Sequence, residues 1–124
     1  MWKEYNPNPS RLKVGDCTVR AISMVFGITW EDAFIRLSNL ALLMNDMPSA
    51  NRVWGEYLRR NGFRRFIIPD TCPDCYTIAD FAEDHPKGRY VVATGSHVVC
   101  VINGVYYDSW DSGGEIPVYY WKRA

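Results

Sequence analysis

Hydrophobic and polar positions follow two different periods along the chain. Up to Asp84, apolar residues recur every three or four positions, a spacing typical of helices that bury one face. This period predicts helices over residues 17–26, 30–45, 50–61 and 78–84, and a short apolar strand over residues 63–68. After Gly88 the pattern changes to short β-branched and aromatic runs, which predict strands over residues 90–94, 97–102, 105–110 and 118–121.

The ends of these elements carry residues that favour caps and tight turns. The candidate N-caps are Asp16, Thr29, Ser49 and Thr77, and the candidate C-terminal glycines are Gly27 and Gly62. Asn103-Gly104 separates two strand-forming runs and predicts a two-residue hairpin turn. Residues 1–16 show almost no period and are expected to form an extended arm.

Helices therefore precede a meandering sheet, an order typical of α+β proteins. The 124 residues suffice for one domain, 1–124, and leave no room for a second core. We expect N-terminal helices packed on a C-terminal antiparallel β-sheet. Apolar residues make up 48% of the chain and charged residues 23%, ordinary globular values that argue against disorder and coiled coil.

Net charge and hydropathy limit which classes of partner and which compartment we expect. Fourteen basic and fourteen acidic residues give a net charge of zero, so a nucleic-acid partner bound through the overall field is not expected. No apolar run is long enough for a signal peptide or a membrane span, and we predict a cytoplasmic protein without a membrane partner. Cytoplasmic thiols are normally reduced, so the cysteines are expected to be thiols or metal ligands rather than disulfides.

One cysteine and one histidine stand where thiol-based acyl chemistry needs them. Cys17 lies at a predicted helix N-terminus, where unpaired amides and the helix dipole favour the thiolate. His97 follows a Gly-Ser turn at the start of a predicted strand and can serve as the base. Each also has a structural interpretation, Cys17 as a small buried residue and His97 as a strand histidine.

The predicted hairpin turn fixes which residues face each other across the two strands. Counting outward from Asn103-Gly104, Cys100 faces Tyr107 and Val99 faces Asp108. Asp108 is then the diagonal neighbour of His97, where a carboxylate can orient the imidazole. Asp111 is the alternative if the following loop folds back. The same count places Cys100 on the opposite face, in the core.

Other residues are candidates for substrate contacts. An oxyanion can be stabilised by the Cys17 backbone N–H and by a side-chain amide upstream, for which Asn8 and Asn6 are the candidates. Both asparagines precede proline and can equally be turn residues. Trp110 can line a substrate groove beside His97 or pack across strands.

The order of Cys17 at a helix start, further helices, then a sheet bearing His97 and Asp108 resembles the papain-like cysteine peptidase superfamily. The Asp16-Cys17 pair is similar to that of bacteriocin-processing peptidases, and the stretches GDCTVRAIS and GVYYDSWDSG resemble small bacterial and phage proteins. The resemblance implies Cys17 as nucleophile, His97 as general base and Asp108 as orienting residue. Arg11 stands where those families usually place a glutamine.

The resemblance implies a cysteine-dependent hydrolase of peptidase or amidase type that acts on a peptide or protein through an acyl-enzyme, with no cofactor and no catalytic metal. Two alternatives remain open. One is an inactive binding module that keeps the scaffold. The other is a zinc-stabilised interaction domain using Cys72, Cys75 and His85, since Cys-x-x-Cys has metal-ligand spacing.

A local cluster of basic residues is the remaining signal. Arg59, Arg60, Arg64 and Arg65 surround a predicted helix C-terminus, where arginines are favourable in any case. A patch that binds a nucleic acid or an acidic partner is the alternative interpretation.

Overall fold

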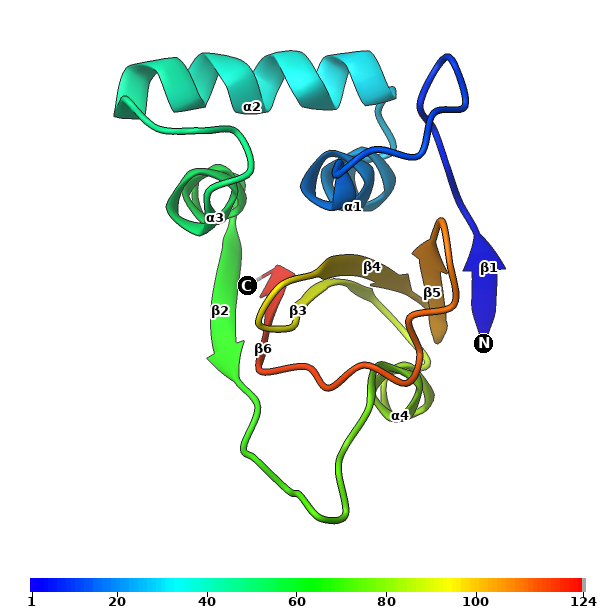
Figure 1. Ribbon diagram of the computed structural model, residues 1–124. Helices are drawn as coiled ribbons and strands as arrows, with labels where there is room; N and C mark the ends of the chain where they lie inside the picture. The colour runs from blue at the N-terminus through cyan, green and yellow to red at the C-terminus, as the bar shows by residue number, and fades with distance from the viewer. Residues whose placement is uncertain (124) are drawn as a thin grey trace.

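The computed structural model describes residues 1–123 and shows an α+β protein with a single mixed sheet (Figure 1). The helices are α1 (Cys17–Phe26), α2 (Trp30–Met44), α3 (Asn51–Arg60) and α4 (Ile78–Asp84). The strands are β1 (Trp2–Glu4), β2 (Phe63–Ile67), β3 (Arg89–Ala93), β4 (Val98–Ile102), β5 (Val105–Asp108) and β6 (Tyr119–Arg123).

The strands lie in the order β1-β5-β4-β3-β6-β2. The expectation of a purely antiparallel sheet is wrong at one edge, because β1 pairs with β5 in parallel, with Trp2 beside Tyr106 and Glu4 beside Asp108. β5 would otherwise present unpaired backbone groups at the sheet edge, and the N-terminal arm satisfies them. All other strand pairs are antiparallel.

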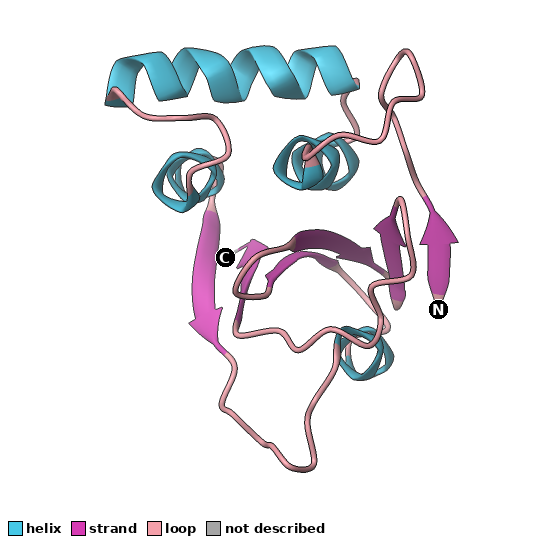
Figure 2. Cartoon of the chain, in the orientation of Figure 1, coloured by secondary structure: helices cyan, strands magenta, loops and turns pink. Residues whose placement is uncertain are grey.

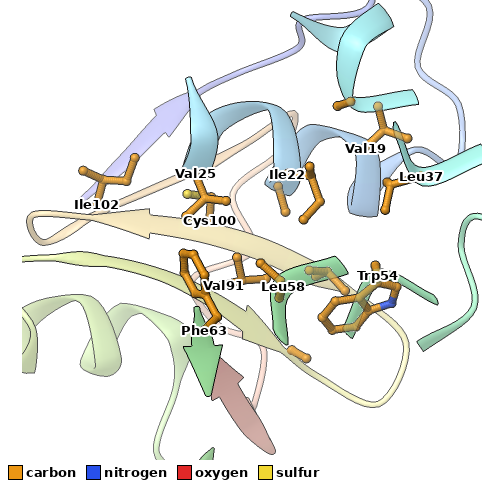
Figure 3. Close-up of a cluster of buried hydrophobic side chains, with 14 residues drawn as sticks. Val19, Ile22, Val25, Leu37, Trp54, Leu58, Phe63, Val91, Cys100 and Ile102 are labelled. Carbon is orange, nitrogen blue, oxygen red and sulfur yellow. The ribbon is translucent and has the colours of Figure 1, made fainter. Parts of the chain in front are cut away.

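Helices cover both faces of the sheet (Figure 2). On one face α1 packs against β3, β4 and β5 and α3 against β2, while α2 lies across α1 and α3 on the side away from the sheet. Valine and isoleucine side chains of α1 point toward Cys100 and Ile102 of β4, and Trp54, Leu58 and Phe63 close the same cluster (Figure 3). The opposite face packs against α4 through Phe81, so the sheet lies between α4 and the other three helices.

Most helix boundaries follow from local chemistry. Gly27 ends α1 with a φ of 64°, and the Thr29 hydroxyl accepts a hydrogen bond from the Asp32 backbone N–H at the start of α2. Thr77 begins α4 in a capping box. The prediction of a Ser49 cap is wrong, because α3 begins two residues later and Ala50 occupies its N-cap position. Within residues 1–123, none of the helices combines the length and apolar character needed to cross a bilayer.

The β4–β5 hairpin has the predicted register. Asn103 and Gly104 both have positive φ, 49° and 80°, as a two-residue turn between twisted strands requires. Ile102 pairs with Val105, and Cys100 pairs with Tyr107. β5 ends at Asp108 instead of continuing to Trp110, and β4 begins at Val98, so His97 and Asp108 lie where strand and loop meet at one end of the sheet.

Candidate active site

Three separate elements bring Cys17, His97 and Asp108 to the same end of the sheet. Cys17 is the first residue of α1, which packs along β4. His97 lies in the turn before β4, where its backbone N–H donates to the Thr94 hydroxyl at 2.9 Å. Asp108 is the last residue of β5, antiparallel to β4. Cys17 and His97 line the same open cleft together with Gly15 and Ser96, which we call the site cleft.

The Asp108 carboxylate is almost completely buried and receives four hydrogen bonds. Oδ2 lies 2.5 Å from His97 Nε2 and accepts a bond from the Ser112 hydroxyl at 2.7 Å. Oδ1 accepts bonds from Arg20 Nη2 at 3.0 Å and from the Ser109 backbone N–H at 2.8 Å. The buried carboxyl is harder to ionise by desolvation, but bonds from His97 and Ser112 and the nearby charges outweigh this and lower its pKa.

The His97 ring binds this carboxylate and lines the site cleft together with Cys17. Because Nε2 faces Asp108, Nδ1 is the ring nitrogen left for the sulfur. Burial alone would lower the pKa of His97, but the contacts with Asp108 and then Cys17 raise it from 6.5 to about 9. This shift favours the protonated imidazole at neutral pH, the form that can pair with a thiolate.

The same contacts favour ionisation of Cys17. Desolvation raises the pKa of the thiol, but the interaction with His97, the Val98 backbone and the positive charges of His97 and Arg20 lower it overall. The first backbone N–H groups of α1 add positive potential at the sulfur. Geometry and electrostatics together favour a thiolate–imidazolium pair.

Arg20 connects both carboxylates of the site, and the sequence reasoning missed it. Its guanidinium is buried, with Nη1 bonded to Asp16 and Nη2 bonded to Asp108. Asp16 makes no helix-capping bond and instead accepts a bond from Trp30 Nε1 at 2.9 Å. A buried arginine needs paired charges, and the spacing of four residues between Asp16 and Arg20 was the available sequence signal.

Trp110 lies beside His97 at the mouth of the site cleft. The ring centroids are 5.1 Å apart and the indole is 45% exposed. Trp110 lines the cleft with Lys13, Val14 and Cys17. The position agrees with the groove residue expected from the sequence, and it leaves an indole face open to solvent.

The candidate oxyanion amides Asn6 and Asn8 are used elsewhere. The Asn8 side-chain oxygen accepts bonds from the Ser10 and Leu12 backbone N–H groups, and Asn6 Nδ2 donates to the carbonyl groups of Arg11 and Leu12. Neither asparagine lines the site cleft. Both asparagines therefore stabilise the N-terminal loop through hydrogen bonds to its backbone, in agreement with the alternative interpretation as turn residues before proline.

The alternative orienting residue, Asp111, also points elsewhere. Its carboxylate accepts bonds from the Tyr106 hydroxyl at 2.7 Å and from the Gly113 backbone N–H at 3.0 Å. The loop following β5 does fold back, but it brings Ser112 rather than Asp111 to the site.

The expectation that Cys72 and Cys75 are thiols or metal ligands is wrong, because a disulfide joins them. The loop turns tightly here, with the Cys72 backbone N–H bonded to Asp70, and brings the two Cα atoms within 4.1 Å. His85 bonds instead to the Phe81 carbonyl group and stacks on the Phe81 ring. Among residues 1–123, no group of three or more His, Cys, Asp or Glu side chains is arranged to hold a metal ion.

Cys100 serves as a natural contrast to Cys17. It is fully buried in the core, as the hairpin register predicted, and burial strongly raises the pKa of its thiol. The two free cysteines therefore differ in both access and ionisation.

Comparisons with protein families, with curated proteins and with solved structures gave no match for this chain. The geometry of the site is therefore the basis for assigning a function.

Proposed function

We propose that the protein is a cysteine-dependent hydrolase of peptidase or amidase type, with a papain-like arrangement of Cys17, His97 and Asp108. The observation that carries the proposal is the His97 ring, which binds the buried Asp108 carboxylate through Nε2 and lines the same cleft as the Cys17 thiol. Structural histidines seldom need both partners, whereas thiol-based acyl transfer requires a nucleophile, a base and an orienting group in this order.

Each step of the reaction can be assigned to a residue of the site. The Cys17 thiolate attacks the acyl carbon of an amide, and the carbonyl electrons move to oxygen, where the N–H groups at the start of α1 can donate hydrogen bonds. The C–N bond then breaks as His97 gives its proton to the leaving amine. His97 next accepts a proton from water, which attacks the thioester, and the thiolate departs from the free carboxylic acid.

Asp108 and Arg20 act as positioning residues in this scheme. Asp108 fixes the His97 ring and stabilises its protonated form, while Arg20 holds Asp108 in place from α1. Arg20 also binds Asp16, the residue before the nucleophile. One guanidinium therefore fixes the start of α1, where Cys17 lies, relative to Asp108, which binds His97.

Alkylation with iodoacetamide followed by mass spectrometry tests the proposal. We expect Cys17 to be modified at pH 7 at least tenfold faster than an ordinary thiol, since about 3% of such a thiol is ionised there. Cys100 is the internal control and should remain unmodified while the protein is folded. The His97→Ala variant should lose the acceleration.

Hydrolysis of a peptide library by the wild-type protein, with Cys17→Ser as the control, is the second arm. If Cys17 reacts no faster than a free thiol and no peptide is cleaved, the enzyme proposal fails. A non-catalytic binding module with the same scaffold then becomes the better explanation.

A further inference from the structure

Next to the site cleft lies a second open cleft between α3 and β6, which we call the α3–β6 groove. Asn51, the first residue of α3, lines both. The Tyr119 end of β6 pairs with Ala93, just before the turn that carries His97. The groove then runs along α3 over Tyr119 and Trp121 to Arg59 and has a volume of about 460 Å³.

The groove combines an aromatic floor with a cationic rim. Tyr119 and Trp121 form the floor, and Gly55 lets α3 approach closely, since a Cβ there would lie 3.1 Å from the Trp121 ring. The arginines of the rim are Arg52, Arg59 and Arg65. Glu56 is the one acidic residue that lines the groove.

The three arginines differ in their partners. Arg52 binds Asp46. Arg59 binds Glu56 through two hydrogen bonds, but Arg60 binds the same carboxylate, so two arginines share one acidic partner. Arg65 makes no ion pair within residues 1–123, and its guanidinium lies over the Tyr119 ring at 5.4 Å from the centroid. An exposed cation held on an aromatic face, with no acidic neighbour bound to it, is free to bind an incoming anion.

We propose that the substrate is a peptide with an acidic side chain that binds Arg65 in the α3–β6 groove while the acyl carbon lies at Cys17. The inference rests on the proposed hydrolase function and adds the substrate class. α3 rises about 12 Å from Asn51 to Arg59, and an extended peptide covers this length with three to four residues. The acidic residue therefore lies at least three or four positions from the reacting amide, because the stretch from Cys17 to the groove adds to this length.

Peptide-linked alkylating reagents test this inference. An iodoacetyl group is attached to either end of peptides of three to six alanines with a distal glutamate, and the matching glutamine peptides serve as the uncharged controls. We expect the glutamate reagent to modify Cys17 about three- to fivefold faster in at least one orientation. This ratio corresponds to the free energy of an exposed ion pair. The difference should fade at about 1 M salt, where the Debye length is about 3 Å.

Two variants, each lacking one arginine charge, test whether Arg65 is the source of the preference for glutamate. Arg65→Gln should abolish the preference for glutamate. Arg64→Gln, which removes the same charge from the adjacent and equally exposed position outside the groove, should keep it. Equal rates for the glutamate and glutamine reagents in both orientations, or a preference that survives Arg65→Gln, would overturn the inference. Simple iodoacetamide tests the activation of Cys17 separately, so failure of the substrate class is distinguishable from failure of the hydrolase proposal.

Discussion

The Asp108→Asn substitution is the most informative single change in this protein. Asp108 receives two hydrogen bonds on each oxygen, from His97 and Ser112 on one and from Arg20 and Ser109 on the other. An asparagine side chain has one acceptor oxygen, so two of the four donors lose their acceptor whichever way the amide turns. The site therefore specifies a carboxylate and not an amide.

The size of the effect follows from the His97 titration. A rise of the His97 pKa from 6.5 to about 9 corresponds to about 3 kcal/mol in favour of the imidazolium, to which Asp108 is the largest favourable contributor. Without the Asp108 carboxylate, the pKa of the Cys17 thiol approaches that of an ordinary thiol, which is about 3% ionised at pH 7. The alkylation rate at pH 7 should accordingly fall by about tenfold, and by no more than about 30-fold.

The assay is the rate of Cys17 alkylation by iodoacetamide from pH 5 to 10. For the wild-type protein we expect the rate to rise at a pH below that of a free thiol and to change again near pH 9, where His97 loses its proton. For Asp108→Asn we expect a single rise at the pH of an ordinary thiol, with the rate recovering at high pH.

The matched control is Asp111→Asn, which removes the same charge three residues away from a carboxylate that binds Tyr106 and not His97. It should leave the alkylation profile unchanged. An Asp108→Asn variant that is folded and keeps the wild-type profile would refute the assignment of Asp108. Circular dichroism establishes folding, since the substitution should also lower the unfolding free energy by about 2–4 kcal/mol.

Three further predictions concern stability, each measured by urea unfolding. Arg20→Met leaves the buried Asp16 carboxylate without its cation and should cost about 3–5 kcal/mol; a loss below about 1 kcal/mol would contradict the paired-charge interpretation. In Cys17→Ser no thiolate balances the His97 proton. Asp108 still raises the folded pKa of His97 above 6.5 in this variant, but not as far as the wild-type value of about 9, because the contribution of Cys17 is lost. The stabilisation is therefore complete below pH 6.5 and should disappear as the pH rises through this lower folded pKa, a steeper fall than in the wild-type protein. Thr77→Ala removes the α4 cap and should cost about 1 kcal/mol, whereas no change would show that α4 is held by packing alone.

The parts of the structure that sequence reasoning predicted are those with local signals. Asn103-Gly104 demands positive φ at two adjacent residues, which set the hairpin register and led to Asp108 as the neighbour of His97. Gly27 likewise marked the end of α1. In each case a few adjacent residues contain the whole physical cause.

The parts that escaped prediction depend on contacts between distant segments. The parallel pairing of Trp2 with Tyr106 joins segments about a hundred residues apart, and nothing in the arm indicates its partner. The link from Arg20 to Asp108 is of the same kind. The Cys72–Cys75 disulfide was missed for another reason: the prediction relied on the expected compartment, while the loop itself brings the two residues together.

The position of β6 in the sheet has a consequence for folding kinetics. This strand pairs with β3 on one side and β2 on the other, so the β2 edge is attached to the rest of the sheet only through Tyr119–Arg123. Closing a loop of more than fifty residues between β2 and β6 carries an entropic cost that must be met before their contacts form. We therefore expect the β3–β4–β5 meander to assemble early and insertion of β6 to be slow, with Trp121 fluorescence reporting the late step.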